Sequence, residues 1–128
     1  MPEKTAAQKL WIREGYSVAV INPPANLVAL LGGLPPGAVI REGDAEPVNL
    51  LLAFIADRLE LELLLPAMKA RLVKNGLLWI AYHKGTSKIK TDIHRDSINA
   101  YAAGLGWLGV AMVSIDDDWS ALRLKLAE

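Results

Sequence analysis

Continuous apolar runs along the chain predict strands that are buried on both faces of a sheet. Three runs of this kind are Ser17–Ile21, Val48–Ile55 and Leu77–Tyr82. A short strand is also predicted over Ala38–Arg41, and a longer one over Trp107–Ile115. We expect the three continuous runs to be adjacent parallel strands at the centre of the sheet.

The last apolar segment, Ser120–Leu126, has a different pattern because apolar and polar residues alternate strictly. Its leucines point to one face, while Arg123 and Lys125 point to the other. Such alternation indicates that one face is in contact with water. We therefore predict an antiparallel edge strand, which pairs with Leu77–Tyr82 on the side away from Val48–Ile55.

Segments with helical spacing or helix-capping residues lie between the predicted strands. Pro24 suits the first position of the second helix, because a missing N–H is tolerated there. The predicted helices are Thr5–Ile12, Pro24 to about Leu31, Asp57 to about Leu72, and a last one that Thr91 or Asp92 caps and that runs through Ala103.

The third of these helices has the clearest signals at both ends. Asp57 is followed three residues later by Glu60, as in a capping box. Pro66 is expected to kink the helix or divide it in two. Asn75-Gly76 is expected to close it, since glycine tolerates the left-handed conformation that ends many helices.

The order of elements predicts an α/β fold with a three-layer, Rossmann-like architecture. Strands alternate with helices, so the sheet should be mostly parallel and covered on both faces, with a C-terminal antiparallel hairpin. The apolar share of 52% is enough for one packed core. With no linker or internal repeat, residues 1–128 form one predicted domain.

Composition excludes several classes of function. The net charge is zero, from 14 basic and 14 acidic residues, so we expect no nucleic-acid partner. There is no cysteine, which removes disulfides, thiol nucleophiles and Cys-based zinc sites. No apolar run reaches the roughly 18–20 residues of a membrane helix, and the N-terminal segment lacks the apolar core of a signal peptide. We expect a cytoplasmic protein that is not associated with a membrane.

Two segments carry a resemblance to known proteins. The helix–Asn-Gly–strand passage, followed by a helix and a C-terminal hairpin, resembles the second half of class I S-adenosylmethionine-dependent methyltransferases. More closely, the chain resembles a bacterial family of small domains, domain-of-unknown-function family three-zero-five-two, from about Trp11 to Leu126. The positions that carry this closer resemblance are Trp79, Lys84, Ser87, Thr91, Asp92, Asp116, Trp119, Ser120, Leu122 and Leu124.

The methyltransferase resemblance implies a truncated version of that fold without its cofactor. In those enzymes a Gly-rich loop follows the first strand, whereas here the loop begins Asn22-Pro23-Pro24. The prolines remove backbone donors and stiffen the loop. Arg41 stands where an acidic residue usually ends the second strand, and a third strand with its helix is missing before Val48. We therefore expect no bound cofactor.

The polar segment after the Leu77–Tyr82 strand is the candidate site. In a doubly wound sheet, ligands bind beyond the carboxyl ends of the strands, where the loops converge. Lysines there favour an anion, hydroxyl groups can donate hydrogen bonds, and the next helix offers its N-terminus. The alternative is a solvated surface loop with no ligand. The predicted anion-binding residues are Lys84, Thr86, Ser87, Lys88, Thr91, Asp92 and Asn22.

Other polar clusters are better explained by structure. His83 and His94 are eleven residues apart, a spacing that demands neither a metal nor acid–base chemistry. Residues 116–118, three aspartates, have calcium-type ligands but not the EF-hand spacing. A charged turn explains them, and we predict no metal site.

Three functions remain open, and whether the protein is an enzyme is undecided. The first is a non-catalytic binding or regulatory module that recognises an anionic small molecule or an acidic protein segment. The second is a methyltransferase-like enzyme with a degenerate cofactor site. The third is a protein-interaction domain. We favour the first, because no complete catalytic motif is present.

Overall fold

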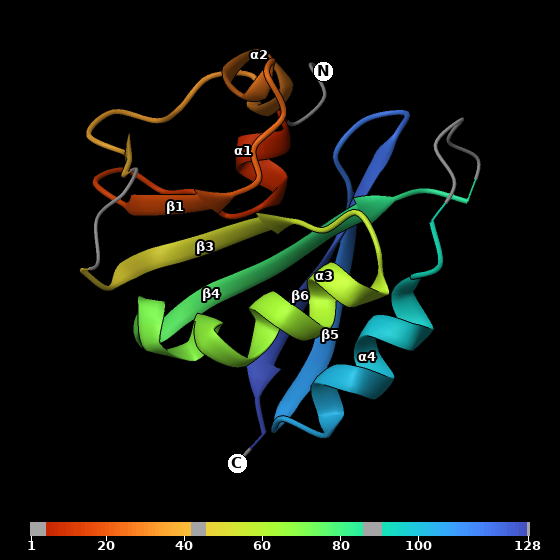
Figure 1. Ribbon diagram of the computed structural model, residues 1–128. Helices are drawn as coiled ribbons and strands as arrows, with labels where there is room; N and C mark the ends of the chain where they lie inside the picture. Colours follow the sequence, from red (N-terminus) through yellow and green to blue (C-terminus); the bar gives the residue numbers. More distant parts are fainter. Residues whose placement is uncertain (1–4, 42–45, 86–90, 128) are drawn as a thin grey trace.

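The computed structural model describes residues 5–41, 46–85 and 91–127, which form one twisted sheet with helices on both faces (Figure 1). The predicted positions Thr86, Ser87 and Lys88 lie outside the described residues. In chain order the elements are α1 (Ala6–Lys9), β1 (Ser17–Ile21), α2 (Leu27–Leu31), β2 (Val39–Ile40), β3 (Val48–Phe54), α3 (Arg58–Leu64), the 3₁₀-helix η1 (Leu65–Arg71), β4 (Leu72–His83), α4 (Arg95–Ala103), β5 (Trp107–Ser114) and β6 (Trp119–Leu126).

The strand order is β2-β1-β3-β4-β6-β5. β1 pairs in parallel with both β2 and β3, and β3 pairs in parallel with β4. β6 is antiparallel to both of its neighbours, β4 and β5. This confirms the predicted Rossmann-like fold, the three adjacent parallel strands and the pairing of the last strand with β4.

The prediction that the last strand forms the edge of the sheet is wrong. β6 lies between β4 and β5, and β5 is the edge. The alternation in β6 is typical of an edge strand, whereas β5, the true edge, is apolar on both faces and therefore has the pattern of an interior strand. Its side chains Leu108, Val110 and Met112 are 48–50% exposed although they are apolar.

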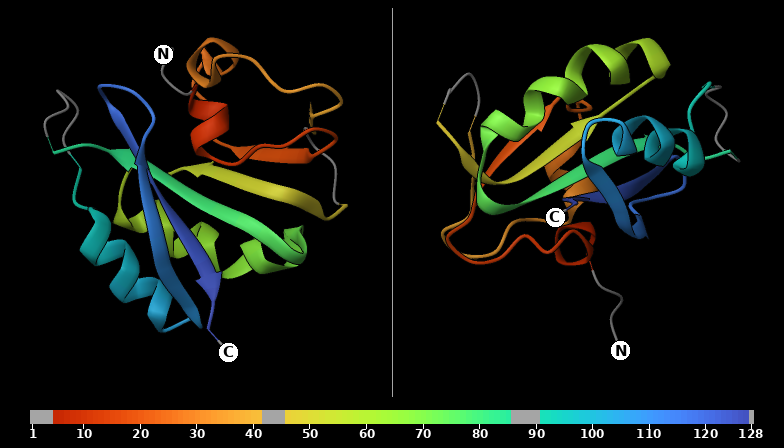
Figure 2. Two further views of the ribbon diagram at one scale, coloured as in Figure 1. Left: turned by 180° about the vertical axis from the view of Figure 1, so that it is seen from behind. Right: turned by 90° about the horizontal axis from the view of Figure 1, so that it is seen from below.

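Helices α1 and α2 cover one face of the sheet, and α3, η1 and α4 cover the other (Figure 2). Alternate residues of the central strands serve the two cores. In β4, Leu78 and Ile80 pack toward α3, η1 and α4, while Trp79 packs toward α1 and α2. The indole nitrogen of Trp79 donates a hydrogen bond to the carbonyl oxygen of Leu10 at 2.9 Å, which ties the sheet to α1.

The predicted third helix is divided at Pro66, as expected. The Asp57 side chain accepts a hydrogen bond from the backbone N–H of Glu60, and the Glu60 carboxylate accepts one from the N–H of Ala56, both at 2.9 Å. α3 ends at Leu64, and the chain continues as η1.

Asn75-Gly76 does not close this helix, which corrects the prediction. The pair lies inside β4, where the pairing with β3 jumps from Leu72 to Leu77. Asn75 has a φ of 64° in this bulge. A helix end and a β-bulge both use a left-handed residue, so the dipeptide alone cannot distinguish them.

Two helix starts also differ from their predictions. α2 begins after Asn26 and not at Pro24, and α4 begins at Arg95, after His94. Only seven residues separate Ile40 from Val48, which is too few for a further strand and helix. In the described part of the chain no helix is long and apolar enough to cross a membrane.

Candidate ligand-binding site

The loops that follow β1, β3 and β4 meet at the carboxyl edge of the sheet. The side-chain amide of Asn22 donates to the carbonyl oxygen of Phe54 at 3.4 Å. The hydroxyl group of Thr91 donates to the carbonyl oxygen of Ala56 at 2.7 Å. Parallel pairing of the three strands brings these loops together, as the pattern of apolar runs predicts.

Asp92 joins the same junction, although it does not cap its own helix. Its carboxylate accepts a hydrogen bond from the backbone N–H of Arg58 at 2.7 Å, at the start of α3. A carboxylate at a helix N-terminus accepts a hydrogen bond from an otherwise free N–H donor, and its negative charge is attracted to the positive end of the helix dipole. Thr91 and Asp92 thus fasten the segment before α4 to the connection between β3 and α3.

Lys84 is directed toward the β5–β6 hairpin. Its ammonium group donates to the hydroxyl oxygen of Ser114 at 2.6 Å, and its backbone N–H donates to the carbonyl oxygen of Asp118 at 2.8 Å. Lys9 reaches the carbonyl oxygen of Ser114 from α1, at 3.1 Å. Lys84, one of the two lysines predicted to bind an anion, therefore already has a structural partner in Ser114.

The Asp-x-x-Trp-Ser segment builds the turn of this hairpin. The carboxylate of Asp116 accepts hydrogen bonds from the backbone N–H groups of Asp118 at 2.9 Å and Trp119 at 2.8 Å. These bonds position the indole of Trp119, which stacks on His83 with 3.9 Å between ring centroids and meets Phe54 edge-on at 4.9 Å. The motif thus has a structural role: it joins the ends of β3, β4 and β6.

The two histidines have different environments. His83 is buried, and its Nδ1 atom has no hydrogen-bond partner among the described residues. His94 is exposed, and its backbone N–H donates to the hydroxyl oxygen of Ser97 at 2.9 Å. Within the described ranges, no three His, Asp or Glu side chains are grouped as a metal site would require.

The loop after β1 differs from the Gly-rich cofactor loop that the methyltransferase resemblance implies. The amino-acid part of that cofactor would approach backbone N–H donors, and Pro23 and Pro24 have none. Asn22 has a φ of 54° and its amide is turned toward Phe54. Just after β2, Arg41 forms an ion pair with Glu46 at 3.8 Å.

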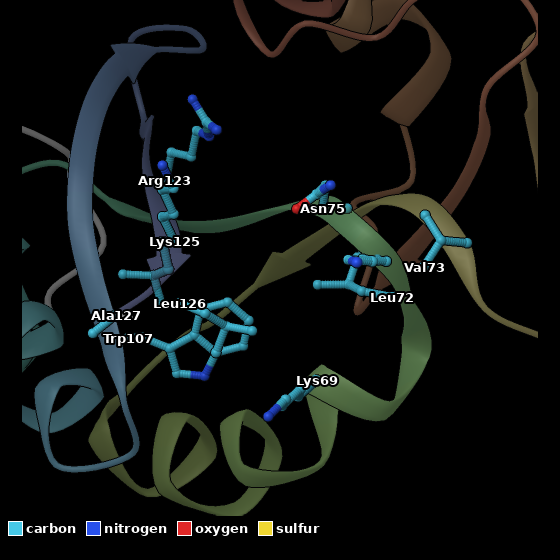
Figure 3. A pocket seen from close by; sticks show the side chains of 12 residues that line it. Lys69, Leu72, Val73, Asn75, Trp107, Arg123, Lys125, Leu126 and Ala127 are labelled. Carbon is cyan, nitrogen blue, oxygen red and sulfur yellow. The ribbon is translucent and has the colours of Figure 1, made fainter.

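A pocket of about 670 Å³ lies at the opposite end of the sheet, between the amino end of β4 and the carboxyl end of β6 (Figure 3). We call it the wedge pocket, because pairing between these strands ends at Leu78 and Leu124 and the strands then splay apart. The twist of the sheet and the bulge in β4 favour this separation. The lining residues are Lys69, Leu72–Gly76, Trp107 and Arg123–Ala127.

The wedge pocket is strongly cationic. Lys69, Lys74, Arg123 and Lys125 line it, and none of its described lining residues is acidic. Trp107, which is buried, forms part of its apolar surface together with leucines of β4 and β6. In Figure 3, Arg123 and Lys125 lie across the pocket from Asn75, and Lys69 lies beside Trp107.

Arg123 is held in position by a strained residue. Its guanidinium carbon lies 4.6 Å from the centroid of the Trp11 ring, a cation–π contact. Its Nε atom is buried and finds no hydrogen-bond acceptor in the described part of the chain. Trp11 has a φ of 65° at the end of α1, where glycine is the usual residue. A bulky residue in this conformation costs on the order of 1 kcal/mol, and here it places the ring over Arg123.

A second hollow, between α3 and α4, is less suited to a charged ligand. It has a volume of about 580 Å³ and contains one charged residue, Arg58. The guanidinium of Arg58 is bound to the carboxylate of Glu62 at 2.7 Å, and this hydrogen bond raises the pKa of Arg58.

No sequence pattern predicts the wedge pocket or its four cations. Lys69 and Lys74 come from the predicted third helix and its end, and Arg123 and Lys125 were assigned to the water-facing side of an edge strand. A weak signal was present, because Asn75-Gly76 directly before an apolar strand is also compatible with a bulge. Such a bulge does not reveal which side chains gather beside it.

Solved structures of methyltransferases resemble the chain over nearly its whole length. With the ribosomal protein L11 methylase from Lactobacillus delbrueckii subsp. bulgaricus, the TM-score is 0.62 at 10% identity, over 96% of this chain and 75% of that one. DhpI, solved as a complex with SAH, gives 0.61 at 8% identity, over 87% and 76%. The m1A22 tRNA methyltransferase TrmK of B. subtilis gives 0.60 at 14% identity, over 99% and 67%.

These likenesses show a Rossmann-like fold similar to that of methyltransferases, in agreement with the distant resemblance. At such low identities the likeness shows the fold alone. The sequence matches no protein-family model and no curated protein.

Proposed function

We propose that this protein is a non-catalytic binding module that holds an anionic ligand in the wedge pocket. The observation that carries the proposal is the composition of the pocket wall, in which four cationic side chains face no described carboxylate. Cations gathered in a cleft with low-dielectric walls focus a positive potential on its interior. An anion would relieve their mutual repulsion.

Size and apolar surface support a ligand larger than a simple ion. The volume of about 670 Å³ lies within the range of roughly 300–1,000 Å³ that is usual for ligand pockets. Trp107 and the neighbouring leucines can cover the apolar part of such a ligand. Its charged groups would then meet lysine and arginine side chains at the rim.

The carboxyl-edge site predicted from the sequence is the competing location within this function. Asn22, Lys84, Thr91 and Asp92 already bind other parts of the chain, which leaves fewer groups for a ligand. We therefore place the ligand in the wedge pocket and keep the carboxyl edge as the alternative that the experiment must separate from it.

The test uses anilinonaphthalene sulfonate, a fluorescent probe with one negative charge on an aromatic body. One variant combines Lys74→Gln with Lys125→Gln. Its matched control combines Lys84→Gln with Lys88→Gln, the two lysines that the sequence predicts for the carboxyl-edge site. Each exposed ion pair contributes up to about 1 kcal/mol, so the wedge variant should bind the probe about tenfold more weakly. Added salt should weaken binding to the unmodified protein.

Each outcome of this titration decides between the locations. Unchanged binding in the control and weakened binding in the wedge variant support the proposal. The reverse result would move the site to the carboxyl edge. Equal binding in all three proteins, or none in the unmodified protein, contradicts the proposed function. Near-ultraviolet circular dichroism confirms that each variant remains folded.

A methyltransferase-like enzyme with a degenerate cofactor site is the second candidate, and the fold comparisons favour it. The prolines after β1 argue against it. We expect calorimetry to show no binding of S-adenosylmethionine tighter than about millimolar, because backbone donors are missing where the cofactor would approach. A micromolar dissociation constant would establish this candidate in place of the first.

Membership of domain-of-unknown-function family three-zero-five-two and a cytoplasmic location are further parts of the proposal. The structure supplies a physical reason for the family motif. Hydrogen bonds of Lys84 join the end of β4 to the β5–β6 hairpin, whose turn is built by Asp116 and Trp119. The two separated segments of the motif therefore lie against each other in the fold.

A further inference from the structure

We propose that the ligand of the wedge pocket is an extended acidic segment of another protein, which pairs with β6 as an added strand. This inference rests on the proposed function, because it names the chemical class of the anion that the pocket holds. Its basis is the combination of charge with an open strand edge.

The edge of β6 that faces the pocket has no neighbouring strand beyond Leu124. Lys125 and Leu126 pair with Leu108 and Trp107 of β5 on their other side, while the pairing with β4 has already ended. Ala127 donates its backbone N–H to Gly106 on the β5 side, so the alternation along an antiparallel strand directs the N–H and C=O of Leu126 toward the pocket. Main-chain groups at a strand edge can pair with an extended peptide, and this mode of recognition is common.

The two faces of β6 at the pocket have opposite character. Arg123 and Lys125 share one face of the strand, and Leu124 and Leu126 share the other. A strand paired alongside places its side chains on the same two faces, next to these residues. The complement of β6 is therefore a segment in which acidic and apolar residues alternate.

β4 closes the other side of the pocket without offering a regular edge. Asn75 has a φ of 64°, and a Cβ atom on Gly76 would lie 2.9 Å from the carbonyl oxygen of Val73. This tight bulge interrupts the pleat, and interruptions of this kind discourage pairing. The added strand therefore pairs with β6. Asn75 of β4 lies across the pocket (Figure 3), and Lys74 of β4 also lines it.

The experiment compares short peptides of equal composition by fluorescence anisotropy with the full chain. One peptide alternates Glu and Val, and another has the glutamates and valines in separate blocks. A third alternates Lys and Val. We expect the alternating acidic peptide to bind about tenfold more tightly than the block peptide, and the Lys peptide not to bind. Two further versions, N-methylated on the valines or on the glutamates, each block one edge of the peptide, and one of them should lose binding.

A charge reversal tests the face assignment. Lys125→Glu should weaken binding of the alternating acidic peptide by about tenfold, whereas Arg95→Glu, an equal change on exposed α4, should leave it within about twofold. If the block and alternating peptides bind equally, or both N-methylated versions bind fully, strand pairing is refuted while the anion site stands. If no peptide binds although the sulfonate probe does, this inference alone fails. If neither binds, the proposed function fails too.

Discussion

Replacing Asp116 by alanine should destabilise the protein, because this carboxylate builds the turn between β5 and β6. It accepts hydrogen bonds from the backbone N–H groups of Asp118 and Trp119, at 2.9 and 2.8 Å. Hydrogen bonds to charged groups contribute about 1.5–3 kcal/mol each, and partial exposure of Asp116 reduces this to about 1 kcal/mol. The expected loss for Asp116→Ala is therefore about 2 kcal/mol.

Urea unfolding followed by tryptophan fluorescence measures this loss, and a thermal melt should show a decrease of about 6–8 °C. Asp116→Asn keeps an acceptor oxygen and should lose less than about 1 kcal/mol. Asp117→Ala, at the exposed neighbouring position, is the control and should change stability by no more than about 0.5 kcal/mol. Equal effects at 116 and 117, or none at 116, would refute the structural interpretation of the motif.

Three further substitutions test other parts of the structure. Trp79→Phe should cost about 2–4 kcal/mol in urea unfolding, since it leaves the carbonyl of Leu10 buried without its donor and creates a cavity; a loss below about 1 kcal/mol would contradict this. Burial raises the pKa of the Tyr82 hydroxyl, so its contribution to stability is complete below pH about 10 and is lost as the pH rises through the folded pKa. Unfolding of Tyr82→Phe should therefore depend less on pH between about 8 and 11 than that of the unmodified protein, and equal slopes would show that Tyr82 is not responsible. Gly76→Ala should lose about 1–3 kcal/mol and bind the sulfonate probe more weakly, because the new Cβ would lie 2.9 Å from the carbonyl oxygen of Val73 and must displace the bulge; unaltered stability would mean that the bulge adapts freely.

The central sheet could be predicted because its signal is local. A run such as Val48–Ile55 is apolar on both faces, and only a strand covered on both sides satisfies it. The hairpin was harder, because either of its strands can lie next to β4 without changing the local pattern. The exposed apolar side chains of β5 made the true edge look like an interior strand, and the alternation of β6 made an interior strand look like the edge.

The candidate site was predictable only in part. Parallel strands bring Asn22, Thr91 and Asp92 to one edge of the sheet, as the sequence indicated. Whether their polar groups face a ligand or each other depends on the connections between loops that are far apart in the chain. The structure shows that the described members bind neighbouring loops, and the role of the carboxyl edge in anion binding stays a prediction.

The alternation of strands with helices and the parallel centre of the sheet could be predicted from the sequence, because apolar periodicity is read within a few residues. The sequence also shows that Pro23 and Pro24, which have no backbone N–H, follow β1 where the methyltransferase resemblance implies a Gly-rich loop. The place where β4 and β6 separate, and therefore the set of cations that line one pocket, depends on the three-dimensional arrangement of the strands. Lys69 and Arg123 are far apart in the chain, and they line the same pocket because a bulge and the sheet twist separate two strands. A site made by a gap between strands depends on register and twist, which no local pattern encodes.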